Sequence, residues 1–351
     1  MKTISRISAV VMSLAMMVSL AACGTDKKGG NVSPSDDASN LSTVSTQVRF
    51  GALYGPTGVS LAKLASQKAT IAEPYSDGKN IYSNSYAADY AEEPTQMVAK
   101  ISSGDVDVAC VPTNLAAKLY KVTGGNIKVA AVSTLGVLYM IDTSGEVKSV
   151  ADLKGKTIYA PSGVQGSNPE YILNFVIEKN GLDDVKVSYE YSVDELTAKI
   201  VSGDVQTIMV PEPKATAIKG QLKKAEKEFS VTDIQAEWNK VCDTPIAQGV
   251  VIVRTDWLKD NEGAFRTFLN DFAASSDAAI NDIDNTVSAV VELGVIPNEA
   301  LAKQAIPNCN IVSVTGEDMK KSVAGFIDVL LNADPQSVGG SAPDDEFYYV
   351  G

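Results

Sequence analysis

The sequence predicts an α/β protein built from two similar lobes. Residues 47–58 show the pattern of a strand followed by a glycine-rich turn, and helical spacing follows, which together open an α/β unit. A second observation is an eight-residue segment that recurs 99 residues further along the chain. The chain of 351 residues, with 45% hydrophobic and 21% charged residues, has the composition of a globular protein and the length of two domains or one two-lobed body.

The N-terminal region has the features of a secretion signal. Two basic residues precede an apolar run at residues 7–20, which is shorter than a typical transmembrane helix. The run ends in Leu-Ala-Ala-Cys23, with small residues as at a signal-peptide cleavage site. This ending resembles a bacterial lipobox, in which Cys23 becomes the lipidated N-terminus after residues 1–22 are removed. The alternative is an ordinary signal peptide that contains a cysteine by chance.

Residues 23–46 are expected to form a flexible tether. The segment is rich in Gly, Ser, Thr, Asn, Asp and Lys and has almost no large apolar residue, so it cannot contribute to a core. Removal of residues 1–22 changes the net charge from −13 to −15, with 28 basic against 43 acidic residues. No later segment is apolar for long enough to cross a membrane, so we expect a folded body held outside the cytoplasmic membrane.

The folded body is expected to start near Gln47. Residues 48–53 alternate as in a strand, Gly55-Pro56-Thr57-Gly58 forms a turn, and residues 59–67 have helical spacing.

The internal repeat predicts one sheet in each lobe. Residues 99–106 read AKISSGDV and residues 198–205 read AKIVSGDV, and each copy continues through a short apolar stretch to Val-Pro. Each copy has the pattern of a helix, a Ser-Gly-Asp turn and a buried strand that ends at proline.

The remaining elements follow from periodicity and from Gly and Pro positions. We expect strands at 127–132, 136–141, 157–160 and 249–254, a helical turn at 152–156, a loop at 161–170, a helix at 171–180, mostly helix over 261–332, and a tail at 339–351 that packs back on the body.

The composition excludes several classes of function. With no histidine, the chain has no Ser-His-Asp or Cys-His nucleophile and no His-ligated metal site. A pI near 4.6 argues against nucleic acid as a partner. The carboxylates are scattered, and Gly155-Lys156-Thr157 lacks the upstream glycine and the following helix of a phosphate-binding loop. We therefore expect no catalytic residue, no metal and no cofactor.

The loops that follow strands are the candidate ligand site. Ligands of open α/β sheets bind at the carboxyl ends of the strands, and helix N-termini there offer free N–H groups to anions or polar groups. Two loops precede helices, at residues 55–58 and 162–167, and the two Val-Pro segments end in further loops. The predicted ligand-binding residues are Thr57, Gly58, Thr113, Asn114, Thr134, Ser162, Gly163, Gly166, Ser167 and Glu212.

Besides Cys23, three cysteines remain in the mature fold. Cys110 lies in a repeated strand and is expected to be buried. Cys242 and Cys309 lie in loop-like sequence in a compartment that permits disulfides, so they are either bridged to each other or two free thiols.

Several of these motifs together resemble a known family. The lipobox, the tether, Gly55–Gly58, residues 103–108, the Asp-Leu-Lys-Gly-Lys segment at 152–156, Gly163–Ser167 and Pro211-Glu212-Pro213 are similar to substrate-binding lipoproteins of ABC importers. Within these the chain resembles the nitrate/sulfonate/taurine and thiamine-pyrimidine (NMT1/THI5-like) group, with the type 2 periplasmic-binding-protein fold.

The resemblance implies a topology. It implies two α/β lobes joined by a two-strand hinge, with lobe 1 formed by residues 47–139 and 250–351 and lobe 2, residues 140–249, inserted between them. The two lobes of such proteins close around a ligand.

The resemblance also implies a function. It implies an extracytoplasmic, lipid-anchored monomer that captures a small polar organic or anionic solute and delivers it to ABC permease subunits. The alternative is a ligand-sensing lipoprotein of the same fold that acts on a membrane receptor. Pyrimidine-synthesising enzymes of this superfamily use an active-site histidine, which this chain lacks. Anionic groups would suit the helix N-termini, whereas Glu212, if it faces the cleft, would favour an amine or a ring N–H. Tyr54, Tyr86 and Tyr139 could stack on a planar ligand.

Overall fold

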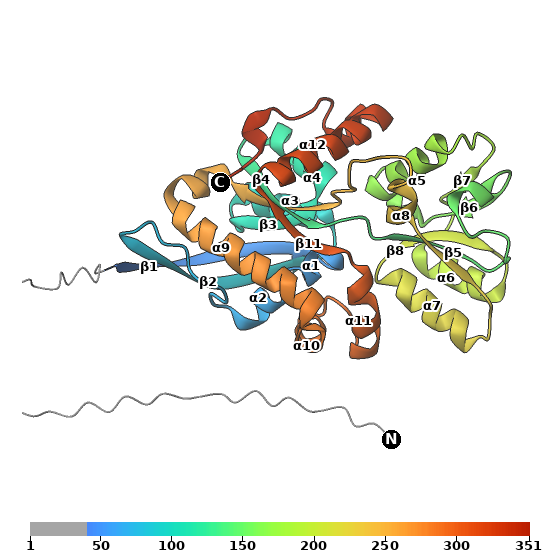
Figure 1. Cartoon of the computed structure of the whole chain (residues 1–351), viewed down its shortest axis with the longest axis horizontal. Coiled ribbons are helices and arrows are strands. Elements are labelled where there is room, and N and C mark those ends of the chain that lie inside the picture. The colour runs from blue at the N-terminus through green and yellow to red at the C-terminus, as the bar shows by residue number, and fades with distance from the viewer. Residues whose placement is uncertain (1–40) are drawn as a thin grey trace, which may run out of the picture. The chain divides into compact units, whose positions relative to one another are not determined.

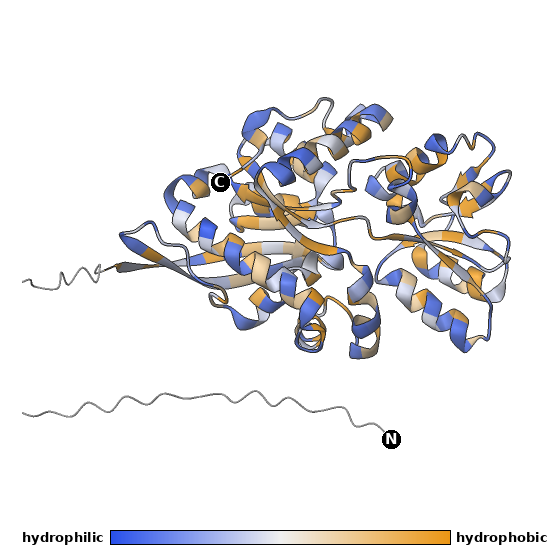
Figure 2. Cartoon of the chain, in the orientation of Figure 1, coloured by the Kyte–Doolittle hydropathy of each residue, from blue (hydrophilic) through white to orange (hydrophobic). Residues whose placement is uncertain are grey.

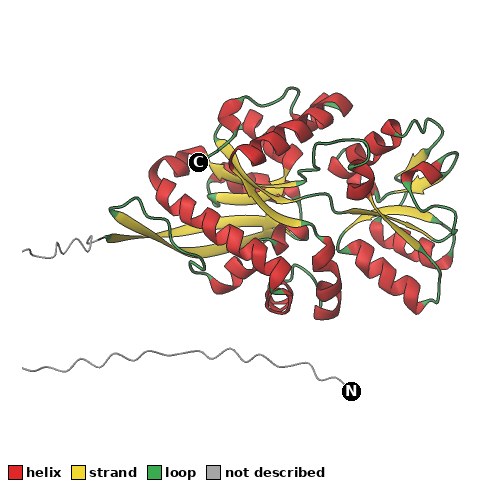
Figure 3. Ribbon diagram, in the orientation of Figure 1, coloured by secondary structure: helices red, strands yellow, loops and turns green. Residues whose placement is uncertain are grey.

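The computed structural model describes residues 41–351 and contains two β-sheets, each covered by helices (Figures 1 and 3). The lipidation candidate Cys23 and most of the predicted tether lie outside the described residues. The strands are β1 (Ser42–Leu53), β2 (Asn80–Ala91), β3 (Val108–Pro112), β4 (Ile127–Thr134), β5 (Leu138–Asp142), β6 (Thr157–Tyr159), β7 (Lys186–Ser188), β8 (Thr207–Pro211), β9 (Ser230–Asp233), β10 (Gly249–Arg254) and β11 (Ile311–Thr315). The helices are α1 (Pro56–Val59), α2 (Ala62–Gln67), α3 (Pro94–Ser103), α4 (Thr113–Val122), α5 (Asn168–Lys179), α6 (Val193–Ser202), α7 (Lys214–Lys224), α8 (Ile234–Trp238), α9 (Thr255–Asn281), α10 (Ile283–Glu292), α11 (Glu299–Ala305) and α12 (Gly316–Ala333).

The five strands of lobe 2 are arranged like five of the six strands of lobe 1. The six-stranded sheet of lobe 1 has the order β11-β4-β10-β3-β1-β2, and the five-stranded sheet of lobe 2 has the order β7-β6-β8-β5-β9. In both sheets the repeated strand, β3 or β8, pairs in parallel with one neighbour and antiparallel with the other. The prediction of two similar α/β lobes is confirmed, and the antiparallel neighbour is in each case the strand that enters from the other lobe.

The repeat forms the element that its sequence predicts. Helices α3 and α6 end at Gly104 and Gly203, whose φ angles of 80° and 96° are left-handed and suit glycine. The chain then enters β3 or β8, both buried until the terminal proline. Figure 2 shows that apolar residues concentrate on the strands and polar residues on the outer faces of the helices.

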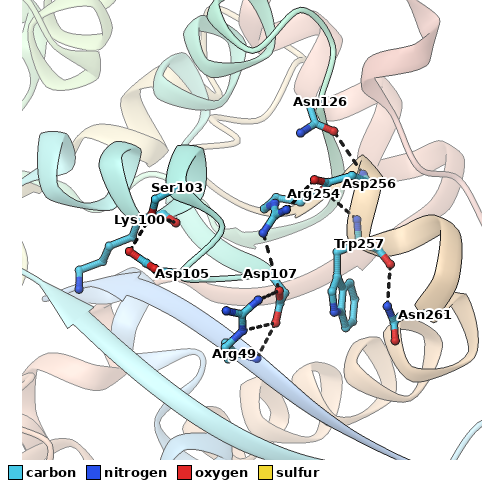
Figure 4. A network of polar contacts seen from close by, with 10 residues as sticks. All are labelled: Arg49, Lys100, Ser103, Asp105, Asp107, Asn126, Arg254, Asp256, Trp257 and Asn261. Atoms are coloured by element: carbon cyan, nitrogen blue, oxygen red, sulfur yellow. Dashed lines mark hydrogen bonds and ion pairs between the residues drawn. The ribbon is translucent and has the colours of Figure 1, made fainter.

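An ion-pair network fixes the repeated turn in lobe 1 at the amino end of β3 (Figure 4). The Asp107 carboxylate, whose side chain is 1% exposed, accepts hydrogen bonds from Arg49 N and Nε, each at 3.0 Å. Arg254 lies 4.0 Å from the same carboxylate and covers Gly104, where a Cβ would lie 2.5 Å from the guanidinium. Because this end of β3 is opposite the end followed by α4, the network supports the sheet and lies away from the cavity described below.

Several expectations about elements need correction. Strand β1 starts at Ser42, not near Gln47, so residues 42–46 are not part of the tether. These small polar and β-branched residues pair in parallel with residues 80–84 through the backbone, and a strand exposed on both faces does not need large apolar side chains. The region 261–332 is mostly helical, as expected, and its one strand, β11, adds an edge strand to lobe 1.

Two short segments cross between the sheets. Residues 135–137 connect β4 of lobe 1 to β5 of lobe 2, and residues 239–248 connect α8 of lobe 2 to β10 of lobe 1. The sheet boundaries lie within two residues of the lobe boundaries implied by the resemblance. Helices α9 to α12 then return to lobe 1, where α9 packs on β2 and β11.

The lobes also contact each other beside the crossings. Trp238 of α8, fully buried, packs on Phe175 of α5 with ring centroids 4.4 Å apart and on Phe326 of α12 at 6.0 Å. A second, polar contact joins Tyr139 of β5 to the Asn308 carbonyl at 3.0 Å. One side of the lobe interface is therefore apolar and the other is hydrogen-bonded.

The C-terminal tail packs on lobe 1 as expected. Phe347 is fully buried and its ring lies 5.1 Å from that of Tyr120, and Tyr349 N donates to the Val129 carbonyl. Among residues 41–351, no helix is both long and apolar enough to cross a membrane.

Within residues 41–351, Cys110, Cys242 and Cys309 are free thiols. The bridge between Cys242 and Cys309 is therefore not formed: Cys309 is buried in the cluster of α10 and α11, where its thiol donates to the Ala305 carbonyl, whereas Cys242 packs on the core that includes Trp238.

Candidate ligand-binding site

A cavity of about 690 Å³ lies between the two lobes at the carboxyl ends of the strands. The ends of β1, β3 and β4 face it from lobe 1 and the end of β8 faces it from lobe 2, together with the first residues of α4, α5 and α7. Its lining residues are Leu53, Tyr54, Gly55, Pro56, Thr57, Pro94, Pro112, Asn114, Leu115, Lys118, Thr134, Val137, Gly163, Ser167, Asn168, Pro169, Pro211, Glu212, Pro213, Lys214, Gln248, Val295 and Pro297. The location is the one at which open α/β sheets bind their ligands.

Proline dominates the wall of this cavity. Seven of the 14 prolines in the chain line it, and Leu53, Leu115, Val137 and Val295 add further apolar surface. Proline has no backbone N–H and a fixed φ, so the wall is rigid and offers few donors. A ligand with an apolar body therefore fits the wall better than a small hydrated ion.

Polar side chains from lobe 1 converge on the cavity. Thr134 is the last residue of β4, Thr57 lies in α1 shortly after the end of β1, and Asn114 lies in the first turn of α4. Lys118 lies one turn further along α4, on the same face as Asn114. Its ammonium has no ion-pair partner among residues 41–351.

Lobe 2 contributes two helix N-termini. Gly163, Ser167 and Asn168 bring the start of α5 to the cavity, and Lys214 begins α7. Lys214 is exposed and, within the described chain, also takes part in no ion pair. The start of each helix carries a partial positive charge, which the nearby carboxylates of Glu170 and Glu212 partly offset. Lys118 and Lys214 are therefore the main positive groups that the two lobes offer to an anion.

The predicted ligand residues separate into two groups. Thr57, Asn114, Thr134, Gly163, Ser167 and Glu212 line the cavity. Gly58, Thr113, Ser162 and Gly166 do not. Thr113 is buried and donates to the Ala247 carbonyl, and Gly58 is packed so closely that a Cβ would lie 2.9 Å from the Tyr90 ring. Ser162 is exposed, and Gly166 faces an outer groove between α5 and α12.

Glu212 lines the cavity, and its carboxylate oxygens bond to Thr216 in the first turn of helix α7. Oε2 accepts a hydrogen bond from Thr216 N at 3.1 Å and Oε1 accepts one from the Thr216 hydroxyl at 2.8 Å. Lys219 Nζ lies 3.7 Å away. Burial raises the pKa of Glu212, and the hydrogen bonds from Thr216 and the Lys219 charge oppose that rise. The carboxyl group is therefore engaged at the first turn of α7 and is not free to bind an amine in the cleft.

Of the three tyrosines considered for stacking, only Tyr54 lines the cavity. It is 41% exposed and stacks on Tyr90 with ring centroids 5.7 Å apart. Tyr86 is buried against Phe268 and bonded to Asp271, and Tyr139 is engaged by Asn308. Only Tyr54 offers an open aromatic face.

The floor of the cavity includes Thr57 and Thr134, which pack against Gly249, the first residue of β10. A Cβ at this position would lie 2.3 Å from Thr134 Oγ1, 2.9 Å from Ser133 Oγ and 3.0 Å from Thr57 Cγ2. These contacts leave no room for any side chain, so glycine is required for Thr57 and Thr134 to keep their places at the floor.

Sequence reasoning missed Lys118, Asn168, Lys214 and Gln248. The spacing of Lys118 four residues after Asn114 on a helix was a usable signal. No sequence signal distinguished Asn168 from its neighbour Ser167.

A second cavity of similar volume, about 690 Å³, lies on the outer face between α5 and α12. Glu170, Glu178, Lys179 and Asp334 are among its lining residues, and no strand end reaches it. It is therefore a groove between helices and not the site of the sheets.

Comparisons with known proteins agree with this geometry. A model of the family described as NMT1/THI5 like matches residues 87–285. The chain belongs to the NMT1/THI5-like family. The prediction of this group from the sequence is confirmed.

Solved structures share the fold of this NMT1/THI5-like chain. An ABC transporter structure from Parabacteroides distasonis matches with a TM-score of 0.69 and 22% identity over 87% of this chain and 99% of the other. The periplasmic aliphatic sulphonate binding protein SsuA from Escherichia coli matches with a TM-score of 0.58 and 15% identity over 81% and 88% of the two chains. The alkanesulfonate-binding protein SsuA from Xanthomonas axonopodis pv. citri, bound to MOPS, matches with a TM-score of 0.53 and 14% identity over 82% and 93%. Comparison with curated proteins found no match to the sequence. The prediction of the type 2 periplasmic-binding-protein fold is confirmed.

Proposed function

We propose that this NMT1/THI5-like protein is an extracytoplasmic solute-binding protein that captures a small organic solute between its lobes and delivers it to an ABC permease. The observation that carries the proposal is the interlobe cavity, which combines strand ends from both sheets with the N-termini of α4, α5 and α7. Such a site binds a ligand through both lobes at once, so ligand binding favours closure.

The lining supports a particular class of solute. Apolar residues and the open face of Tyr54 suit an alkyl or aromatic body. Lys118 and Lys214, one from each lobe, suit an acidic group such as a sulfonate or carboxylate. We therefore propose an organic anion with an apolar body as the solute.

The proposal includes lipid anchoring and the absence of catalysis. Cys23 would carry the lipid, and residues 24–41 would connect it to β1. Permease and membrane are then the macromolecular partners, and the protein works as a monomer. Catalysis is not part of the proposal because the cavity holds no nucleophile–base pair: Glu212 is engaged by Thr216, and the chain has no histidine.

A thermal-shift screen on the mature chain tests the proposal. Benzenesulfonate, taurine, nitrate and simple pyrimidines are suitable probes, and a bound solute raises the melting temperature by mass action. We expect benzenesulfonate to raise it more than nitrate does, and the radius of gyration in solution scattering to fall on binding. No shift with any solute in a broad panel, together with unchanged scattering, would contradict the proposal.

The charge of the two lysines provides a matched test. Lys118→Met and Lys214→Met keep an unbranched side chain one atom shorter and remove its charge, and each is expected to weaken benzenesulfonate binding about tenfold, roughly 1.4 kcal/mol. Lys63→Met, on α2 and away from the cavity lining, is the control and should leave binding unchanged.

A further inference from the structure

Asn168, the first residue of α5, occupies an unusual position in the wall of the interlobe cavity. It lines the cavity between Ser167 and Pro169, yet its side chain is only 2% exposed. Both Nδ2 and Oδ1 are buried, and neither has a hydrogen-bond partner in the described chain. Within residues 41–351 it is the one side-chain amide with both polar atoms in this state.

Asn168 also has no role in forming its own helix. The N-cap position belongs to Ser167, whose hydroxyl donates back to the Val164 carbonyl, and no side chain caps α5. Two other interior amides have structural partners: Asn84 donates to the Ala264 carbonyl, although its Oδ1 is unpaired, and Gln235 accepts a hydrogen bond from Gly136 N. A buried amide without partners is destabilising, so a purely structural position would favour an apolar residue of the same size.

We infer that Asn168 binds the solute directly, with both atoms of its amide, and that the solute carries a hydrogen-bond donor next to an acceptor. This inference rests on the proposed function and specifies the end of the solute that faces lobe 2. The lobes of such proteins move relative to each other when they bind a ligand, and we expect that movement to open the amide to the solute.

The chemistry of the amide defines the ligand edge. Nδ2 is a donor and Oδ1 is an acceptor, and together they pair with a planar edge such as a carboxamide or the N–H/C=O edge of a heterocycle. A sulfonate, carboxylate or nitrate group only accepts, so it satisfies Nδ2 and leaves Oδ1 unpaired. A site built to hydrogen-bond a substrate group rejects analogues that lack it.

The test compares three probes with one aromatic body: benzamide, benzoate and benzenesulfonate. At the Asn168 end benzamide supplies a donor and an acceptor, whereas the other two supply acceptors only. Asn168→Leu is expected to raise the melting temperature of the ligand-free protein and to weaken benzamide binding at least tenfold, with a smaller loss for benzoate. This combination separates ligand binding from a structural role, because loss of a structural hydrogen bond would lower the melting temperature.

Two further variants keep the test decisive. Asn174→Leu, an exposed position on the same helix, is the control and should leave benzamide binding unchanged. Asn168→Asp keeps the shape, loses the donor and should weaken binding of all three probes, the two anions most. The inference is overturned if Asn168→Leu destabilises the ligand-free protein, or if Asn168→Leu or Asn168→Asp binds benzamide like wild type. The proposed function would survive those results, and it fails only if no solute in the broader panel binds.

Discussion

The floor of the cavity depends on the absence of a side chain at Gly249, and Gly249→Ala tests this directly. The added Cβ would lie 2.3 Å from Thr134 Oγ1 and 3.0 Å from Thr57 Cγ2, well inside van der Waals contact. Overpacking of this kind costs about 1–3 kcal/mol. Loss of backbone freedom in the unfolded chain offsets about 0.4–1 kcal/mol of that cost. We expect net destabilisation of about 1–2 kcal/mol, which lowers the melting temperature by about 2–8 °C at 2–4 °C per kcal/mol.

The same substitution should reduce solute binding, because Thr134 and Thr57 line the cavity and must move into it. The matched control is Gly220→Ala in helix α7, where a Cβ would have no neighbour within 4 Å. That change should stabilise the protein by about 0.5–1 kcal/mol and leave binding unchanged. Urea unfolding and titration calorimetry measure both effects. Wild-type stability and affinity in Gly249→Ala would refute the account of the floor.

Three further predictions concern the lobe interface, α7 and the cavity rim. Trp238→Ala removes a fully buried ring between the lobes and should cost about 3–5 kcal/mol in urea unfolding, and an unchanged midpoint would contradict the interface described. Burial raises the pKa of Glu212 in the folded state, so its contribution to the free energy of unfolding is present below pH 4.5 and is lost as pH rises through the raised pKa. Glu212→Gln should therefore make the free energy of unfolding depend less on pH in this range. Identical pH profiles for wild type and variant would contradict the burial of an ionisable Glu212. Tyr54→Ala should weaken binding of an aromatic solute about tenfold, with Val122→Ala as the exposed control, and equal affinities would exclude stacking at this face.

Much of the fold could be predicted from the sequence because the residues that determine its repeated elements are close together in the chain. The Ser-Gly-Asp turn fixes the end of each repeated helix through a left-handed glycine, and the apolar stretch before Val-Pro fixes the buried strand. The two copies of this helix–turn–strand unit therefore predicted two similar sheets, one in each lobe. The first five residues of β1 were missed because their strand is held by backbone pairing with β2 and exposes its side chains, so hydrophobic patterning does not reveal it.

The sequence predicted the loops that form the site but not which side chains face the cavity. Strand ends and helix starts indicated the right loops, but the direction of each side chain depends on tertiary contacts. Glu212 turns to Thr216 instead of the cleft, Ser162 and Gly166 lie outside it, and Asn168, adjacent to a predicted residue, is the buried one. One residue of shift at a helix start rotates a side chain by about 100°, and sequence spacing does not fix that rotation.

A crystal structure of the mature protein with the solute that gives the largest thermal shift tests the central claim most directly. The account predicts the solute in the interlobe cavity, in contact with Asn114 from lobe 1 and with the start of α5 from lobe 2. A solute that contacts one lobe only, or that lies in the outer groove between α5 and α12, would contradict it.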